Sequence, residues 1–239
     1  TGIWPELGPE DASIARLVLP LPLATGRADE ARLTYDFALS EGGAGSTRLS
    51  DLTCVVFDTE TTGLDEMQAD LVGICLATAP GKACYIPVGH VAGGDDLFGQ
   101  SAPVAGQLPL ADVLAALKPL LEDPAILKIG QNLKYDWKML ARHGIRMAPV
   151  DDTMLMSYAL NAALHNHGMD ELAQTYIGHR CQPIKELIGA GKNQITFAQV
   201  PIDRATRYAA EDAEVTWRLW QHFRPQLPAA QVTTVYETL

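Results

Sequence analysis

The feature that most constrains the fold of this chain is a run of β-branched and apolar residues that ends in a pair of acids. Residues 53–57 have the sequence Thr-Cys-Val-Val-Phe, and Asp58-Thr59-Glu60-Thr61-Thr62-Gly63 follows directly. A run of this length and composition predicts a central strand buried on both faces. Because side chains alternate along a strand, Asp58 and Glu60 project to the same side of the sheet. Their oxygens suit a shared divalent cation, although turn formation and helix capping explain the same letters.

Strand and helix signals after this run alternate in a way that predicts an α/β fold. Further strands are expected over residues 70–77, 83–88 and 126–130, and Ala79-Pro80-Gly81-Lys82 forms a hairpin turn between the first two. Helices are expected over residues 110–121, 132–143, 152–162, 170–176 and 203–223. Asp152, Asp170 and either Asp203 or Arg204 begin the last three helices, whereas Gly144 and Pro225 end the second and the fifth. The sheet therefore begins as an antiparallel meander and is covered by helices.

Two segments carry turn-forming residues instead of a regular pattern. Residues 1–48 mix Pro, Gly and Ala with a few apolar stretches and end in Glu41-Gly42-Gly43-Ala44-Gly45-Ser46, which predicts a turn or linker. Residues 93–106 are rich in Gly and predict a loop that forms a mobile rim. A chain of 239 residues, 47% of them hydrophobic, can bury one sizeable core. One domain with an N-terminal extension is expected.

Charge and cysteine usage restrict the functional classes. The formal net charge is −11 and the pI is about 4.9, so no global positive field attracts the chain to nucleic acid. Any contact with nucleic acid must be local and assisted by metal. The four cysteines form no Cys-x-x-Cys pair, which fits a reducing cytosol. No apolar run reaches the roughly 18 residues of a membrane span, and the first residues do not resemble an export signal.

Three further residues can join the two acids in one site. Asp136 lies at the start of the helix expected after residue 130, where capping of the helix dipole is the alternative explanation. Tyr208 and Asp212 are four residues apart, which stacks the phenol and the carboxylate on one helix face. A solvated amphipathic helix is the alternative there. Because the four acids come from separate elements, the sequence predicts that they converge.

Phosphodiester hydrolysis requires this kind of arrangement. An attacking water must be activated and a leaving oxygen stabilised, and two divalent ions can serve both purposes. Magnesium prefers oxygen ligands and takes only a few carboxylates, so four acids suffice for two ions and no His or Cys ligand is required. Crowded carboxylates without metal repel one another, so some of their pKa values are expected to rise. Cation binding is then expected to stabilise the fold.

At these residues the chain resembles the DEDD-type 3′-5′ exonucleases of the tyrosine-bearing subclass. The resemblance is greatest to the proofreading domains of bacterial family A DNA polymerases. Three motifs carry it, namely Phe57-Asp58-Thr59-Glu60-Thr61, Gly130-Gln131-Asn132-Leu133-Lys134-Tyr135-Asp136 and Tyr208-Ala209-Ala210-Glu211-Asp212. Similarity continues between the motifs, as in Asp152-Thr153-Met154-Leu155 and Gly191-Lys192-Asn193-Gln194, and covers about residues 50–228.

The resemblance implies a ribonuclease-H-like fold, with a mixed five-stranded sheet flanked by helices, and a two-metal site. Asp58 would bridge both ions, which are expected to be Mg²⁺, with Mn²⁺ or Zn²⁺ able to substitute. Glu60 and Asp212 would complete the tighter site, and Asp136 would support the second ion. Tyr208 would orient the attacking water together with Glu60, because a phenol with a pKa near 10 is a poor base at neutral pH.

The resemblance also implies substrate contacts. Leu64 matches a position that wedges between the last bases, and Gln131 and Asn132 match positions near the substrate strand, although buried structural amides would give the same letters. Lys192 and Arg207 are near the motifs and can contact phosphates, with ordinary surface charge as the alternative. His165 and His167 are expected to make structural hydrogen bonds. The three tryptophans of the helices are expected to pack in the core, namely Trp137, Trp217 and Trp220.

The domain organisation and partners follow from the same resemblance. Residues 1–48 are expected to be an extension or linker, residues 49–228 the exonuclease domain, and residues 229–239 a tail leading toward a polymerase domain. The chain is then a fragment or a free-standing exonuclease. The expected partner is the 3′ end of single-stranded DNA, with a polymerase domain in cis if the chain is a fragment. A monomer in the bacterial cytosol, associated with the nucleoid, is expected.

Three functions remain open from the sequence. The first is a DNA proofreading exonuclease that acts on single-stranded or frayed 3′ ends and releases nucleoside 5′-monophosphates. The second is an RNA-trimming enzyme similar to ribonuclease D, which shares this motif set and differs in its contact to the 2′-hydroxyl. The third is a catalytically silent module that binds 3′ ends or supports a polymerase. This third function ranks below the other two, because all four acids and the tyrosine of the motifs are present.

Overall fold

The computed structural model of the chain describes residues 52–79, 81–92, 102–105 and 107–238, together with the backbone of residues 16–18, 34–38 and 44–48. Most of the N-terminal extension and of the loop expected at residues 93–106 lies outside these ranges. The described part of the extension forms an antiparallel sheet of β1 (Arg16–Val18), β2 (Thr34–Ala38) and β3 (Ala44–Arg48), in that order. The expected turn or linker is therefore wrong for residues 44–46, which belong to β3, and its residues 41–43 lie outside the described part.

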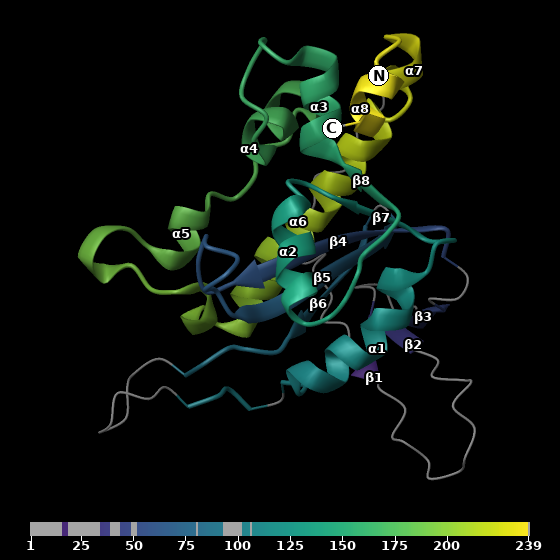
Figure 1. The fold of residues 1–239 in the computed structure, drawn as a ribbon. Helices are drawn as coiled ribbons and strands as arrows, with labels where there is room; N and C mark the ends of the chain where they lie inside the picture. The colour runs from purple at the N-terminus through teal and green to yellow at the C-terminus, as the bar shows by residue number, and fades with distance from the viewer. Residues whose placement is uncertain are drawn as a thin grey trace, which may run out of the picture.

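A mixed five-stranded sheet forms the centre of the main domain (Figure 1). Its strand order is β6-β5-β4-β7-β8, and its strands are β4 (Cys54–Thr61), β5 (Leu71–Ala79), β6 (Lys82–Pro87), β7 (Leu127–Gly130) and β8 (Val150–Asp152). The first three strands are an antiparallel meander, whereas β7 and β8 run parallel to β4. The fold predicted from the resemblance is thus confirmed.

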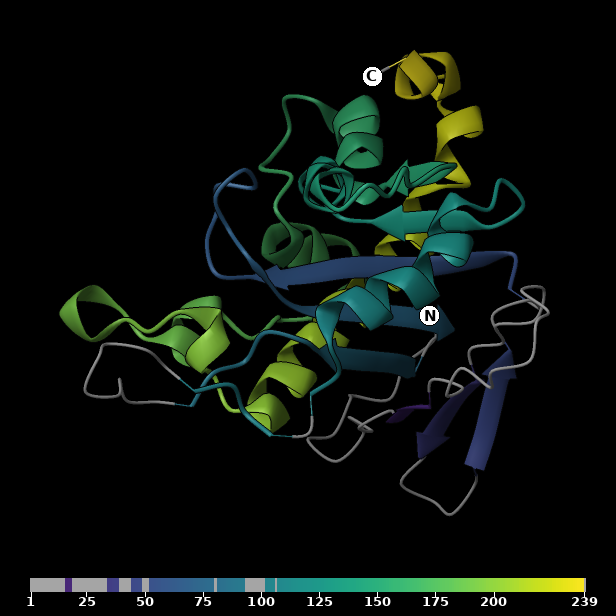
Figure 2. The ribbon, with the colours of Figure 1, turned by 60° about the horizontal axis from the view of Figure 1, so that its bottom comes forward.

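Helices cover both faces of the sheet (Figures 1 and 2). They are α1 (Leu110–Glu122), α2 (Lys134–Arg142), α3 (Thr153–Asn161), α4 (Met169–Leu172), α5 (Ile184–Ile188), α6 (Ile202–Phe223), α7 (Gln226–Ala229) and α8 (Thr233–Thr238). The described residues also include a π-helical turn at Ala173–Ile177 and 3₁₀ turns at Gly191–Asn193 and Phe197–Gln199. None of the described helices is long and apolar enough to cross a bilayer.

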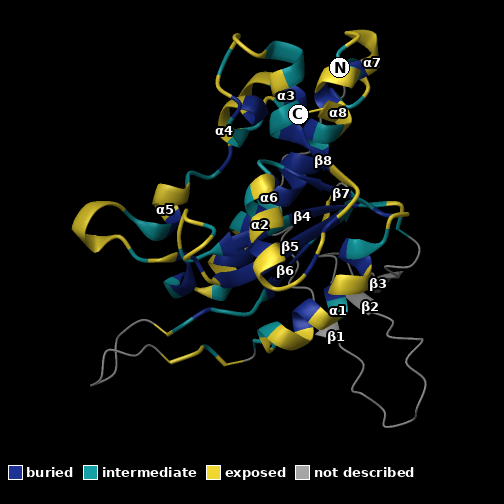
Figure 3. Ribbon diagram, in the orientation of Figure 1, coloured by how far each residue is buried: buried dark blue, intermediate teal, exposed yellow. Residues whose placement is uncertain are grey.

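The alternation of side chains along β4 divides the core into two layers. Val55 and Phe57 pack with residues of α1 and α2, whereas Val56 packs with residues of α6. All three side chains are fully buried, as expected for a strand covered on both sides (Figure 3). Continuing the alternation sends the side chains at positions 58 and 60 toward α6 and the side chain at position 59 toward α2. The sheet thereby directs the two motif acids to the face that α6 covers.

A third cluster of buried residues lies at one end of the sheet, where α3, α4, α7 and α8 gather around the end of α6 (Figure 1). Tyr236 of α8 is 8% exposed and belongs to this cluster. Its hydroxyl donates to Asp151 and accepts the backbone N–H of Asp152, each at 2.9 Å. The residues after 228 therefore include a helix that is tied to β8.

Several helix ends differ from the predictions. The second helix begins at Lys134, because Asn132 adopts a left-handed φ of 58° that a helix excludes, and it ends before Gly144, as expected. Asp152 caps α3 as predicted. The prediction for Asp170 is wrong, since Gly168 is the N-cap residue of α4 and Asp170 lies inside its first turn. The long helix α6 begins at Ile202, one residue before the predicted start, after Pro201.

The tryptophans of the helices differ in their exposure, and two histidines are hydrogen-bonded within the protein. Trp217 is 7% exposed and packs against Trp220, as predicted, but Trp137 is 46% exposed, so its assignment to the core is wrong. The histidines make the expected structural hydrogen bonds. His167 Nδ1 lies 2.9 Å from the Ser157 hydroxyl, and His165 Nε2 lies 2.6 Å from the hydroxyl of Tyr176. At position 137 of α2, hydrophobic periodicity did not show whether the side chain lies on the packed or on the exposed face of the helix.

Candidate active site

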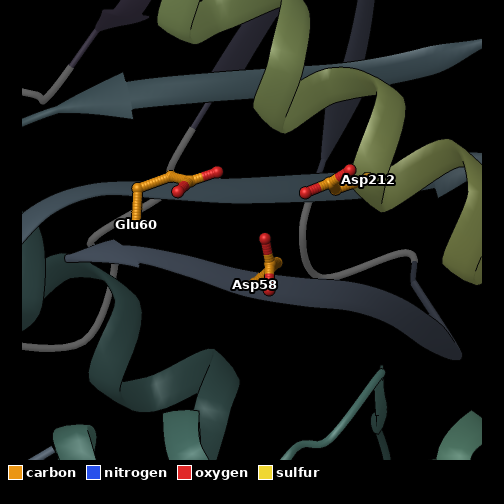
Figure 4. A group of neighbouring side chains, drawn as sticks. All are labelled: Asp58, Glu60 and Asp212. Carbon is orange, nitrogen blue, oxygen red and sulfur yellow. The ribbon is translucent and has the colours of Figure 1, made fainter. Parts of the chain in front are cut away.

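Three acidic side chains meet between β4 and α6 (Figure 4). Asp58 and Glu60 extend from the same face of β4, and Asp212 extends from α6 toward them. One carboxylate oxygen from each lies within 4.8 Å of the others. Glu60 and Asp212 are each 8% exposed, and Asp58 is partly exposed. Among the described residues, this is the one group of His, Cys, Asp and Glu side chains with spacing suited to a metal ion.

Asp136 lies beside this group and is held differently. Its side chain is 3% exposed, and its Oδ1 accepts the backbone N–H of Thr59 at 3.0 Å and the hydroxyl of Thr59 at 2.5 Å. Thr59 points toward α2 because it alternates with Asp58 and Glu60 along β4. The structure thus brings all four acids predicted from the motifs to one region, three in a group and the fourth next to it.

The electrostatics of the site reflect burial and mutual repulsion. Burial raises the pKa of Asp58 from 3.8 to about 7. The pKa of Glu60 is raised well above its ordinary value, first by burial and then by the charges of Asp58, Asp212 and Asp136. Burial and the charge of Asp58 likewise raise the pKa values of Asp136 and Asp212. Four carboxylates in this arrangement are costly to ionise together without a cation.

The donor set fits a divalent cation. Glu60 Oε1 is buried and has no hydrogen-bond partner among the described residues. A buried carboxylate oxygen without a partner costs free energy, and a cation can satisfy it. All available ligand atoms in the group are carboxylate oxygens, which hard cations such as Mg²⁺ prefer. The geometry and chemistry of the three residues therefore support a cation-binding site.

Tyr208 lies one helical turn before Asp212 on α6 and is hydrogen-bonded to its carboxylate. The phenol is partly buried, and its ring packs near that of Phe197 with 6.0 Å between the centroids. Burial, followed by the charges of Asp212, Glu60 and Asp58, raises the pKa of Tyr208 well above its ordinary value. The hydroxyl therefore stays protonated at neutral pH and acts as a hydrogen-bond donor.

The predicted substrate-contacting residues have different environments in the structure. Leu64 is 95% exposed in the connection between β4 and β5. Gln131 uses both ends of its amide within the protein, because Nε2 donates to the His167 carbonyl and Oε1 accepts the Thr153 hydroxyl. Asn132 is partly exposed in its left-handed turn. Lys192 and Arg207 are exposed, the first in a 3₁₀ turn and the second on α6.

Some contacts at the site were not anticipated from the sequence. Thr59 stands between the two motif acids, and strand alternation turns its side chain to the opposite face, but no pattern in the sequence identifies Asp136 as its partner there. Tyr135 donates its hydroxyl to the Gly63 carbonyl and lies 2.7 Å from the Thr61 hydroxyl, so α2 also supports the loop after β4. No local pattern in the sequence indicates the bond between Tyr135 and Gly63, because the two residues are 72 positions apart.

Comparison with curated proteins places these features in a family. A family model described as a 3′-5′ exonuclease of the DNA polymerase A type matches residues 44–228. DNA polymerase I of Rhizobium leguminosarum is 50% identical over 194 residues, which is 77% of this chain and 19% of that protein. DNA polymerase I of Pseudomonas aeruginosa is 42% identical over 205 residues, which is 84% of this chain and 22% of that protein. The chain thus spans about a fifth of the length of these relatives.

Solved structures support the fold. NrnC of Brucella melitensis aligns with a TM-score of 0.58 at 23% identity, over 79% of this chain and 80% of that one. Escherichia coli RNase D, an exoribonuclease, aligns with a TM-score of 0.54 at 17% identity, over 79% of this chain and 43% of that one. At these identities the likeness concerns the fold alone. From the family match and the identity to the polymerases, the chain belongs to the DNA polymerase A family of 3′-5′ exonucleases and is a nuclease.

Proposed function

We propose that this chain hydrolyses phosphodiester bonds at single-stranded or frayed 3′ ends of DNA and releases nucleoside 5′-monophosphates, as the proofreading domain of a DNA polymerase I. The observation that carries the proposal is the group of Asp58, Glu60 and Asp212, in which a buried Glu60 oxygen lacks a partner among the described residues. Such a group is unfavourable in a protein without a cation and suits metal-assisted hydrolysis.

Two divalent ions are proposed, with Mg²⁺ as the natural ion and Mn²⁺ or Zn²⁺ as substitutes. Asp58, Glu60 and Asp212 would hold one ion, and Asp136 would support a second together with Asp58. The chemistry that such ions supply when bound is activation of a water and neutralisation of negative charge on the leaving oxygen. Asp136 already accepts two hydrogen bonds from Thr59, which fixes its carboxylate relative to β4.

Two side chains of the protein, Tyr208 and Glu60, would orient the attacking water. Tyr208 keeps its proton at neutral pH, because burial and the neighbouring carboxylates raise its pKa, so it donates a hydrogen bond and does not act as a base. Its bond to Asp212 holds the phenol toward the carboxylate group. Glu60 would accept a hydrogen bond from the same water, since one of its oxygens has no hydrogen-bond partner among the described residues. Tyr208 and Glu60 together would therefore direct the attack on the terminal phosphodiester.

Further residues are proposed to contact the substrate strand. The exposed Leu64 side chain would insert between the last bases, and Asn132 would contact the strand near the site. Lys192 and Arg207 would bind phosphates without selecting a sequence, since both are exposed. Gln131 is proposed to act through its protein contacts with His167 and Thr153 more than through the substrate.

DNA is proposed over RNA because the relatives with 50% and 42% identity are DNA polymerases, whereas the likeness to RNase D is one of fold. We also propose residues 49–228 as the exonuclease domain, a polymerase domain in cis as its partner, a monomeric state and a cytosolic location associated with the nucleoid. The two DNA polymerase I relatives, each about five times the length of the matched segment, support the cis partner.

The test uses oligonucleotides labelled at the 5′ end, one single-stranded DNA and one RNA of the same sequence, incubated with Mg²⁺ or with EDTA. The proposal predicts a ladder that shortens from the 3′ end of DNA, needs Mg²⁺ and is absent for Asp58→Asn. A ladder on RNA with intact DNA would support the RNA-trimming alternative. Binding of 3′ ends without any ladder would support a silent module.

A further inference from the structure

Asp152, at the junction of β8 and α3, joins the start of α3 to the turn that leads into α2. The residue is 6% exposed. Its Oδ1 accepts the backbone N–H groups of Met154 at 2.9 Å and Leu155 at 3.4 Å, which is the usual capping of α3. The carboxylate also accepts the N–H groups of Asn132 at 3.1 Å and of Leu133 at 2.8 Å. Half of its hydrogen bonds therefore go to another element, about twenty residues earlier in the chain.

The turn between β7 and α2 depends on support from outside. Asn132 has a left-handed φ of 58°, which residues other than glycine adopt rarely. Gly130 has no room for a side chain, because a Cβ atom there would lie 2.3 Å from Leu133 Cδ1. The N-cap residue of α2, Leu133, makes no side-chain capping bond. The Asp152 carboxylate supplies the missing acceptor, and the hydroxyl of Thr153 adds a bond to the Gly130 carbonyl at 3.1 Å.

The turn determines where α2 begins and therefore where Asp136 lies. The N–H of Trp137 donates to the Leu133 carbonyl at 2.8 Å, so Leu133 and Asp136 belong to the same first helical turn. A shift of Leu133 moves this turn with it, because the Trp137 N–H is bonded to the Leu133 carbonyl. Asp136 would then lose its alignment with Thr59, which binds it through two hydrogen bonds.

We propose that Asp152 is a positioning residue of the exonuclease site, which fixes the entry of α2 and thereby the carboxylate of Asp136 and the backbone of Asn132. This inference rests on the function proposed above. Both oxygens of Asp152 accept backbone N–H groups, so the carboxylate is bound to the start of α3 and to the turn before α2. It acts through Asp136, in the way that partners of metal ligands set the ligands' orientation.

The alternative is that Asp152 only caps α3, and Asp152→Ser separates the two roles. A serine N-cap keeps an oxygen for the first N–H groups of α3, at little cost in helix stability. It has no second oxygen for Leu133 and its side chain is shorter. Asp152→Asn is the second variant, which keeps the shape and one acceptor oxygen. Asp151→Asn is the matched control, because Asp151 is equally buried and is bonded by Trp220, Tyr236 and Arg224 but has no bond to the turn.

The experiment measures amide hydrogen exchange by NMR and the Mn²⁺ concentration for half-maximal binding, and then DNA cleavage. For Asp152→Ser we expect faster exchange at Asn132 and Leu133, retained protection at Leu155, and a rise of about tenfold to hundredfold in the half-saturating Mn²⁺ concentration. Asp152→Asn should lie between this variant and the unaltered chain. Asp151→Asn should leave the exchange of the turn and the binding of Mn²⁺ unchanged.

Unchanged exchange at the turn and unchanged Mn²⁺ binding in Asp152→Ser would overturn the positioning role and leave simple capping. An equal loss in Asp151→Asn would also overturn it, because the effect would then come from general destabilisation. Absence of DNA cleavage by the unaltered chain would refute the proposed function instead, while the exchange and Mn²⁺ measurements would still decide the role of Asp152.

Discussion

Thr59 and Asp136 are 77 residues apart in the chain, yet Thr59 donates both its backbone N–H and its hydroxyl to a single oxygen of Asp136, at 3.0 and 2.5 Å. The contact joins β4, which carries Asp58 and Glu60, to α2. Hydrogen bonds to a carboxylate favour its ionised form, so these two bonds oppose the rise in the pKa of Asp136 that burial and Asp58 cause. Thr59 thus keeps the fourth acid in place and closer to its charged state.

The hydroxyl of Thr59 can be removed without changing the shape of the side chain. In Thr59→Val we expect the Mg²⁺ concentration for half-maximal activity to rise about tenfold to hundredfold, because Asp136 loses one of its two donors. Thr59→Ser keeps the hydroxyl and should behave like the unaltered chain. Titration of Mg²⁺ in a DNA cleavage assay measures both. Equal Mg²⁺ dependence of the valine and serine variants would contradict the role of the hydroxyl.

Asp212→Asn should abolish activity and stabilise the metal-free protein. Loss of a ligand should lower kcat/KM by more than about a hundredfold. Mutation of a residue that only supports a ligand can already cost up to about a hundredfold. In EDTA at neutral pH the free energy of unfolding should rise by about 1 kcal/mol or more, since the cost of burying the Asp212 carboxylate and its repulsion with Asp58 are both removed. Asp203→Asn, which removes an exposed acid of the same helix, is the control. A destabilised Asp212→Asn protein would indicate a structural role for the acid.

The metal-free protein should lose stability as the pH rises. The pKa of Asp58 is raised from 3.8 to about 7 in the folded state, so folding favours the protonated form. Its contribution is fully present below about pH 4 and is lost as the pH rises through about 7. Glu60, Asp136 and Asp212 shift in the same direction.

Thermal unfolding in EDTA across this pH window measures the effect. The melting temperature should fall with rising pH, the fall should be smaller in Asp58→Asn, and saturating Mg²⁺ should remove most of it, because a bound cation favours the ionised carboxylates. A melting temperature in EDTA that is flat or increases between about pH 5 and 7.5, in both proteins, would contradict the assignment.

Tyr208→Phe should slow the reaction and leave cation binding intact. The variant removes the hydroxyl that is bonded to Asp212 but keeps the ring beside Phe197. We expect kcat to fall about tenfold to hundredfold, because the attacking water loses one of the groups that orient it. The affinity for Mn²⁺ should not change. The pH profile of the remaining activity should keep its shape, because the phenol does not titrate near neutral pH. A change in the profile's lower or upper limb would mean that Tyr208 transfers a proton.

The sequence was informative where the physics is local. Strand alternation brings Asp58 and Glu60 to one face, and the four-residue spacing places Tyr208 above Asp212, so the core of the site could be predicted. The convergence of β4 with α6 came from the motif order and the resemblance. The mixed sheet also came from that resemblance, because β8 has only three residues and its pattern is too short to indicate a strand.

What could not be predicted depends on contacts between distant segments. The bonds from Thr59 to Asp136, and from the turn at Asn132 to Asp152, join a side chain to partners that no periodicity connects. The exposure of Trp137 likewise depends on which face of α2 lies against the sheet, and its composition does not reveal this. In the first 48 residues, β2 does alternate polar Thr34 and Asp36 with apolar Tyr35 and Phe37, but β1 has only three residues and the Gly-rich start of β3 favoured a turn.

The central claim is that Asp58, Glu60 and Asp212 form a divalent-cation site that makes this chain a nuclease. Calorimetric titration of Mn²⁺ into the protein tests it most directly, with Asp58→Asn and Asp212→Asn beside the control Asp203→Asn. The account predicts saturable binding by the unaltered chain and the control, and affinity reduced by at least about tenfold in both site variants. Equal binding by all four proteins, or none by any, would contradict it.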